Sequence, residues 1–374
     1  MSQSTKRPIH LLLAALLLFA AVPAHAEEEQ FIDQFETFAG FLADFRKEKS
    51  IRALTAVIVE DGEIRWEQAF GTSDDEGDIP ATMDTTFSIA SVTKPIAAMA
   101  ILRESLAGRV SLELPLSAHE GWEGFCAWFA GSGIPFGSGG VDSDGTSIAP
   151  VRCDPAPQLG EILNMRANGA ADGPFVYNPI AYARIDRAIE ASGGRKLREI
   201  LRDNILIPAG MRDVALGWQD PDSGSALRLL APPFTVREDG SDEKASFADD
   251  DLRAAAGIIA SARHIAQFDM ALDRGDLLPQ VWTDRITKGP PPPAKGDYRW
   301  GWFVQDWNGQ RLVWHSGWEP ERYSAIYLKV PEKRLSLIVL ANNENLWWSN
   351  PLTGAAIEDS PVAARFLELF ANQD

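Results

Sequence analysis

Two short segments rich in apolar, β-branched and aromatic residues lie early in the chain. They cover residues 54–60 (LTAVIVE) and 63–70 (EIRWEQAF), and Asp61-Gly62 stands between them. An Asp-Gly pair tolerates the positive φ angles that a tight hairpin turn requires. The pattern therefore predicts a β-hairpin over residues 54–70.

A second group of apolar segments lies near the end of the chain. YRWGWFVQDW and QRLVWHSG flank Asn308-Gly309, and SAIYLKV and LSLIVLAN then flank Pro331-Glu332-Lys333. Turn residues between strand-like runs are typical of consecutive antiparallel strands. This part of the chain is predicted to form an antiparallel meander.

Between these groups, the apolar positions recur at helical spacing. Such segments cover residues 95–107, 180–192, 196–206 and 261–272, and their period of three to four residues indicates helices with one buried face. Strands at both ends with helices between them predict an α+β fold. One antiparallel sheet would be built from both chain ends and flanked by helices, with a helical subdomain inserted over about residues 105–250.

The first 26 residues have the pattern of a secretory signal peptide. Lys6 and Arg7 precede an apolar run over residues 11–22, and small residues follow at Ala24 and Ala26. The run of 12 residues is shorter than the roughly 20 that a membrane-spanning helix needs. We predict cleavage after Ala26, an exported and periplasmic mature domain over residues 27–374, and no stable membrane anchor.

Acidic side chains outnumber basic ones. The chain of 374 residues has 35 Lys and Arg against 53 Asp and Glu, a net charge of −18. Loss of residues 1–26 removes two cations and no acid, which makes the charge −20. Such a surface disfavours nucleic acid as a partner, and a small-molecule substrate is expected instead. The oligomeric state is not specified by the sequence.

Two cysteines, Cys126 and Cys153, flank a stretch rich in Gly and Ser. In a protein bound for an oxidising compartment, they are candidates for a disulfide. The alternative is a pair of free thiols.

The first candidate for catalysis is the sequence SVTK at residues 91–94. Positions three apart share a face of a helix, so the Lys94 amine can reach the Ser91 hydroxyl. Lys94 could serve as a base near neutral pH only if its pKa fell by about 3 units. The alternative interpretation is that Ser91 caps a helix beside an ordinary lysine.

His315 is the second candidate, in the sequence WHSG at the end of a predicted strand. It could place positive charge or a hydrogen-bond donor beside Ser91. The alternative is a histidine bonded within the fold. The histidines are scattered and no HExxH pattern occurs, so no metal site and no cofactor are expected.

Together with further segments of the chain, SVTK and WHSG resemble the class C β-lactamase-like serine hydrolases of the serine β-lactamase and penicillin-binding protein superfamily. The resemblance runs from about residue 50 to the end. It includes TTFSIASVTKPIAAMAI, IPAGMRD, AAAGIIASARHIAQF, YRWGW and WHSG. SVTK matches the first motif of the family, and HSG matches the third, which is KTG in β-lactamases and HxG in many peptidases and esterases.

The second motif, usually YxN, departs from the family pattern. The spacing after Phe175 places Tyr177 at the catalytic tyrosine, with Tyr182 as the other assignment. Asn178 then occupies the middle position and Pro179 the place of the second polar residue. The resemblance implies that one polar contact is missing unless Asn178 substitutes for it in substrate binding.

The resemblance also implies how the site works. Ser91 attacks a carbonyl while Lys94 and Tyr177 share its proton, and His315 binds a carboxylate or tunes Tyr177. Gly317 belongs to the substrate-binding strand, and the backbone N–H groups of Ser91 and Trp318 form the oxyanion hole. The Trp318 indole either narrows the pocket or packs the turn.

Three function classes follow from this interpretation. The favoured one is an exported serine hydrolase that forms a covalent acyl-enzyme with small esters or amides, D-amino-acid peptides among them. The second is a true β-lactamase or a penicillin-binding DD-peptidase. The third is a non-catalytic binding protein on the same fold, because Pro179 and the turn after Gly317 are unusual.

Overall fold

The computed structural model describes residues 24–247 and 251–372. The predicted signal peptide lies almost entirely outside the described residues. Seven strands form the main sheet, in the order β10-β11-β12-β13-β14-β1-β2. Their bounds are β1 Ala53–Glu60, β2 Glu63–Gly71, β10 Asp297–Arg299, β11 Trp302–Trp307, β12 Gln310–Glu319, β13 Tyr323–Val330 and β14 Leu335–Ala341.

The sheet joins the two ends of the chain. β1 pairs antiparallel with β14, with Val57 opposite Ile338, and the remaining strand pairs of the sheet are also antiparallel. The predicted hairpin and meander thus form one sheet. The predicted β-lactamase/transpeptidase-like α+β fold is confirmed.

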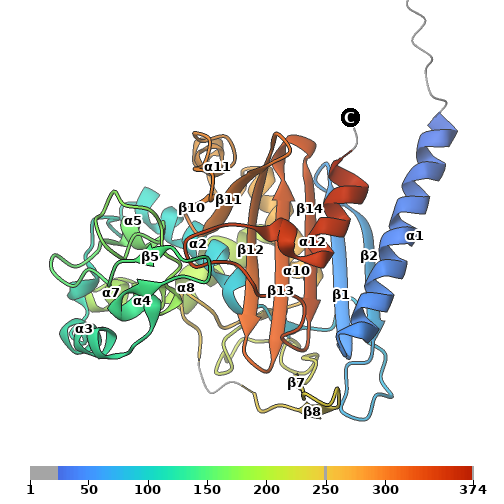
Figure 1. The fold of residues 1–374 in the computed structure, drawn as a ribbon, viewed down its shortest axis with the longest axis horizontal. Coiled ribbons are helices and arrows are strands. Elements are labelled where there is room, and N and C mark those ends of the chain that lie inside the picture. Colours follow the sequence, from blue (N-terminus) through green and yellow to red (C-terminus); the bar gives the residue numbers. More distant parts are fainter. Residues whose placement is uncertain (1–23, 248–250, 373–374) are drawn as a thin grey trace, which may run out of the picture.

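Helices cover both faces of this sheet (Figure 1). On one face lie α1 (Ala24–Glu48) and α12 (Pro361–Phe366), where the Phe38 ring is 6.1 Å from that of Phe366. On the other face lie α2 (Thr93–Leu106) and α10 (Ala262–Asp273). Helix α1 was not among the predicted elements.

A mostly helical region lies beside the sheet, on the left in Figure 1. Its helices are α3 Trp122–Gly131, α4 Pro135–Ser138, α5 Leu159–Ile162, α6 Pro179–Tyr182, α7 Ile185–Ala191, α8 Leu197–Leu201 and α9 Ile207–Ala209. The helix predicted over 180–192 is interrupted between α6 and α7. Cys126 and Cys153 are joined by a disulfide in this region.

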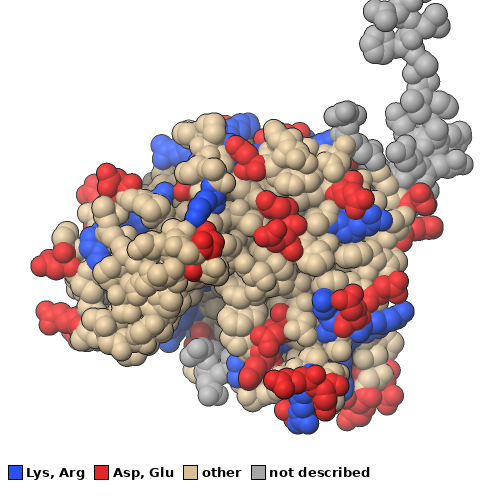
Figure 2. Space-filling model, in the orientation of Figure 1, with Lys and Arg blue, Asp and Glu red and all other residues tan. Residues whose placement is uncertain are grey.

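Shorter elements complete the fold. They are β3 Phe87–Ser88, β4 Gly140–Val141, β5 Ser147–Ile148, β6 Ala215–Leu216, β7 Phe234–Val236, β8 Asp242–Lys244, β9 Ile258–Ala260 and α11 Gln280–Thr287. β3, β9 and β6 form a small sheet of their own. On the face shown in Figure 2, acidic and basic side chains are intermingled, and no large basic patch is visible.

Residues 342–356, between β14 and α12, form a crossing segment. In Figure 1 it runs in dark red across β12 toward the helical region. Asp142 of that region accepts hydrogen bonds from the backbone N–H of Leu352 (3.1 Å) and of Thr353 (2.8 Å). The Leu352 carbonyl in turn accepts from the N–H of Tyr177 at 2.7 Å. The crossing segment therefore ties the sheet to the helical region.

A buried ion pair links α10 to the sheet. Lys329 of β13 donates to Asp269, and the Tyr327 hydroxyl (2.5 Å) and the Ser336 hydroxyl (3.0 Å) donate to the same carboxylate oxygen. The side chains of Lys329 and Asp269 are almost fully buried. Each charge therefore depends on the other for the solvation that water would otherwise give.

We predict that Asp269→Ala destabilises the protein by about 3–5 kcal/mol, because it leaves the buried Lys329 ammonium with only Asp273, a partly exposed carboxylate 3.0 Å away, as its described acidic partner. A urea unfolding curve measures this. Glu368→Gln, which alters an exposed pair with Arg365, is the control and is expected to shift the free energy of unfolding by less than about 0.5 kcal/mol. Equal midpoints for the two variants would contradict the prediction.

Candidate active site

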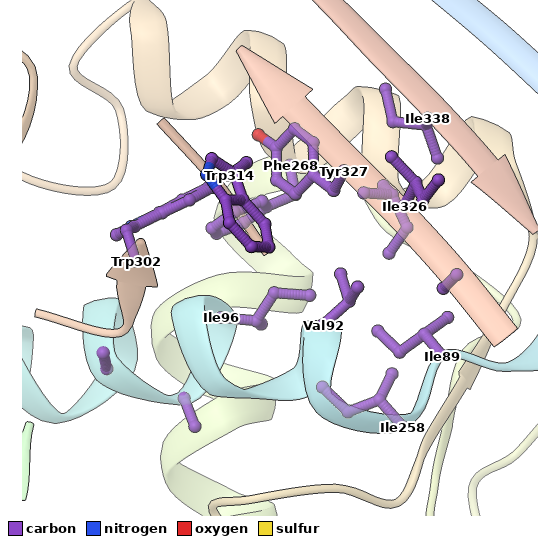
Figure 3. Close-up of a cluster of buried hydrophobic side chains, with 14 of the residues drawn as sticks. Ile89, Val92, Ile96, Ile258, Phe268, Trp302, Trp314, Ile326, Tyr327 and Ile338 are labelled. Carbon is purple, nitrogen blue, oxygen red and sulfur yellow. The ribbon is translucent and has the colours of Figure 1, made fainter. Parts of the chain in front are cut away.

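Ser91 lies in a short 3-10 turn, Ala90–Val92, between β3 and α2. The turn is fixed from both sides: the Ile89 N–H donates to the Ile258 carbonyl at 3.1 Å, and Val92 points from the helix into the core toward Ile326 (Figure 3). Ala90 has φ +46°, which an alanine adopts only when its surroundings impose it. The fold thus holds the serine in a fixed position.

Lys94 is fully buried beside this serine. Its Nζ atom lies 2.7 Å from Ser91 Oγ and donates to the Ala255 carbonyl at 2.9 Å. Burial lowers the pKa of Lys94 well below its usual value, because the charged form loses its hydration. The arrangement favours a neutral amine that can accept the Ser91 proton.

Tyr177 is buried against the same pair. Lys94 Nζ lies 5.1 Å from the centre of the Tyr177 ring. Burial raises the pKa of Tyr177 and the nearby Ser91 opposes that rise, so the phenol is neutral at pH 7. Its hydroxyl makes no hydrogen bond of full geometry to another described residue. Tyr182, the other assignment, instead donates its hydroxyl to the Lys94 carbonyl at 3.2 Å.

His315 on β12 adjoins this tyrosine, with the two ring centres 5.8 Å apart. Its Nδ1 lies 2.7 Å from the Ser316 carbonyl, so Nδ1 carries the proton, and Nε2 accepts from the Tyr298 hydroxyl at 3.1 Å. Burial, and then Lys94, lower the pKa of His315 well below its usual value. A neutral ring with both nitrogens engaged does not supply the positive charge that the sequence suggested.

Gly317 allows β12 to lie against the nucleophile turn, the 3-10 turn Ala90–Val92 that contains Ser91. A Cβ atom at this position would lie 2.4 Å from the Ile89 carbonyl oxygen and 3.2 Å from the Ala90 Cβ. Only glycine permits this approach. β11 pairs with β12 only as far as Trp314, so beyond that residue one edge of β12 has no partner among the described strands. Gly317 and Trp318 lie on this open stretch.

The Asn178 side chain bonds to other parts of the fold, whereas the motif suggested that it binds substrate. Its Oδ1 accepts from the Ala181 N–H at 2.9 Å, and its Nδ2 donates to the Phe136 carbonyl and to Asn168. Asn178 therefore caps α6, and Pro179 is the first helical residue, a position that needs no N–H donor. Both residues serve the local fold.

Several site residues were missed by the sequence interpretation. The Tyr298 hydroxyl donates a hydrogen bond to His315. Glu319 accepts a hydrogen bond at 2.7 Å from the hydroxyl of Ser88, which lies three residues before Ser91. The Ala255 carbonyl contacts Lys94, and no residue-type pattern could reveal a backbone group. Tyr298 belongs to the YRWGW sequence. The predicted meander places this sequence next to the HSG strand, and that neighbourhood was the signal that could have identified Tyr298 as a site residue.

These features can be compared with known proteins. A family model described as Beta-lactamase matches residues 38–357. The chain belongs to this family. Its members and structural neighbours include esterases, amidases, β-lactamases and penicillin-binding proteins, which are serine hydrolases of the SxxK type.

Individual relatives are distant or align only locally. Esterase EstB of Burkholderia gladioli is 38% identical over 71 residues, which cover 19% of this chain and 18% of the esterase. Penicillin-binding protein 4* of Bacillus subtilis (strain 168) is 22% identical over 78% of this chain and 68% of its own. D-amino acid amidase from Ochrobactrum anthropi SV3 has a TM-score of 0.64 and 17% identity, covering 91% and 99% of the two chains.

Among the described residues, no helix has the length and apolar character to cross a membrane. No three His, Cys, Asp or Glu side chains within residues 24–247 and 251–372 are grouped as metal ligands.

We predict that Gly317→Ala slows acylation of Ser91 by at least about 100-fold, the scale of losing one oxyanion donor, because the added methyl group pushes β12 away from the nucleophile turn. The rate of labelling by a fluorophosphonate measures this. Gly124→Ala on α3, where a Cβ meets nothing within 4 Å, is the control and keeps the full rate. A Gly317→Ala protein that labels as fast as the control would contradict the close approach.

Proposed function

We propose that the protein hydrolyses small esters or amides through a covalent acyl-enzyme on Ser91. The observation that carries this proposal is the 2.7 Å contact between Ser91 Oγ and a fully buried lysine amine. Ser91 Oγ forms a bond to the substrate carbonyl carbon while Lys94 accepts the hydroxyl proton. The N–H groups of Ser91 and Trp318 are assigned to the resulting oxyanion.

Tyr177 then serves the leaving group. Because its phenol is neutral, it acts as the proton donor, and Lys94 returns the serine proton to the tyrosine as the carbonyl–leaving-group bond breaks. In the second half of the reaction water attacks the acyl-enzyme carbonyl and gives a proton to Lys94. The bond from the acyl carbon to Ser91 Oγ then breaks, and Lys94 returns the proton to Ser91 Oγ as the acid leaves. His315 acts as a positioning residue that holds the Tyr177 and Tyr298 rings.

A β-lactamase or DD-peptidase is the second candidate, because both the family model and a curated relative carry such names. Neutral His315, with both nitrogens engaged, gives no cation that could bind the carboxylate of a penicillin. This observation favours esters and linear amides, including D-amino-acid derivatives, over lactams. A purely non-catalytic role is disfavoured by the contact between Ser91 and Lys94.

We also propose that the chain is exported to the periplasm, as the first 26 residues indicate. The disulfide between Cys126 and Cys153 suits such a compartment. N-terminal sequencing of protein from the periplasmic fraction would test the cleavage after Ala26.

We predict that a fluorophosphonate adds one adduct mass to the folded protein and that Ser91→Ala abolishes this adduct. The reason is that Ser91 Oγ lies 2.7 Å from the fully buried Lys94 amine, which can accept the hydroxyl proton. Intact mass spectrometry measures the adduct, and a fluorescent penicillin added in parallel ranks lactams against other acyl donors. Ser143→Ala, in the loop between β4 and β5, is the matched control. An adduct that persists in Ser91→Ala, or folded wild-type protein without an adduct, would refute the proposed function.

A further inference from the structure

A hollow of about 540 Å³ lies between α1, the start of α12 and the crossing segment, next to Trp318 at the end of β12. Its apolar part is formed by Phe45 of α1 and by Leu346 and Trp347 of the crossing segment, and its wall by Trp318 and Trp348. The two indole rings are stacked, with their centres 5.6 Å apart and their planes 4° from parallel. None of the catalytic side chains assigned above lines this hollow.

The stacked indoles connect the hollow to the reaction centre. The Trp348 ring lies 5.8 Å from the Tyr177 ring, and Trp318 directly follows Gly317, which contacts the nucleophile turn. A ligand that passes along the open edge of β12 therefore meets the indoles next to the tyrosine. Because Tyr177 is assigned to the leaving group, the hollow lies on the leaving-group side.

The charges around the hollow favour a cation. Glu344 accepts a hydrogen bond from Trp318 Nε1 at 2.9 Å, so a carboxylate is fixed at the edge of the indole wall. Asp359 is a second carboxylate at the lining. The one lysine there, Lys49, is paired with Glu48 at 3.0 Å. The electron-rich faces of tryptophan rings also attract cations.

We propose that this hollow is a subsite for the positively charged leaving group of an ester or amide substrate, such as an amino alcohol or an amine-bearing amide. The inference rests on the proposed function for its catalytic part. The substrate ammonium lies against the Trp318–Trp348 pair and Glu344, and its carbonyl reaches Ser91. A negatively charged group at the same place would be repelled by the two carboxylates.

Two substrates of similar shape test this proposal. They are 3-(trimethylammonio)phenyl acetate, with a cationic leaving group, and 3-tert-butylphenyl acetate, its neutral counterpart. The measured quantity is the ratio of their kcat/KM values, compared between wild-type and variant protein so that the intrinsic reactivity of each ester cancels. Glu344→Gln removes the charge and retains an acceptor for Trp318 Nε1.

We expect Glu344→Gln to lower this ratio about fivefold, the scale of one partly exposed ion pair. Trp348→Ala should lower it as well, through loss of the indole face. In wild type, 0.5 M NaCl should reduce the ratio, and in Glu344→Gln salt should have a smaller effect. The control is Trp128→Ala, an exposed tryptophan on α3, which should leave the ratio unchanged. Ratios that are equal in wild type, Glu344→Gln and Trp348→Ala would overturn the subsite.

A binding measurement separates failure of the subsite from failure of the hydrolase. 3-Hydroxyphenyltrimethylammonium is titrated against Ser91→Ala and against Ser91→Ala with Glu344→Gln, and tryptophan fluorescence reports the Kd. About fivefold weaker binding to the double variant supports the subsite even if wild type hydrolyses neither ester. Equal Kd values, or no binding to either, overturn it even where wild type turns over the neutral ester.

Discussion

The chemistry proposed here depends on the burial of one amine. Lys94 has no exposed surface, and no carboxylate of the described residues favours its charged form. The groups that its nitrogen contacts are the Ser91 hydroxyl and a backbone carbonyl. A lysine in water is protonated at neutral pH and cannot accept a proton. Burial removes that obstacle, so the core that surrounds Lys94 is part of the catalytic apparatus.

The rest of the fold keeps this amine dry and the serine in place. Val92 of the nucleophile turn and Ile96 of α2 pack against the sheet (Figure 3), and β12 approaches the nucleophile turn because position 317 has no side chain. From the other side, the crossing segment binds Asp142 through Thr353 and places Trp348 against Tyr177. Sheet, helical region and crossing segment thus meet at one point.

The sequence indicated the parts of this arrangement that leave a local pattern. The strands at both ends, the helix after Ser91 and the spacing between Ser91 and Lys94 follow from periodicity and turn residues, and the fold class was correct. The sequence could not show that Asn178 caps a helix or that both His315 nitrogens are engaged. These facts depend on residues such as Phe136 and Tyr298, which tertiary packing brings close. The stack of Trp318 on Trp348 has the same origin, since 30 positions separate the two.

The pH dependence of Ser91 acylation tests the central claim most directly. The second-order rate constant for labelling by a fluorophosphonate is measured from pH 6 to pH 10, with circular dichroism to confirm that the protein stays folded. Because burial holds the pKa of Lys94 well below its usual value, the rate constant should stop rising well below pH 10. A rate constant that rises about tenfold per pH unit up to about pH 10, as an ordinary lysine with a pKa of about 10.4 would dictate, would contradict the account.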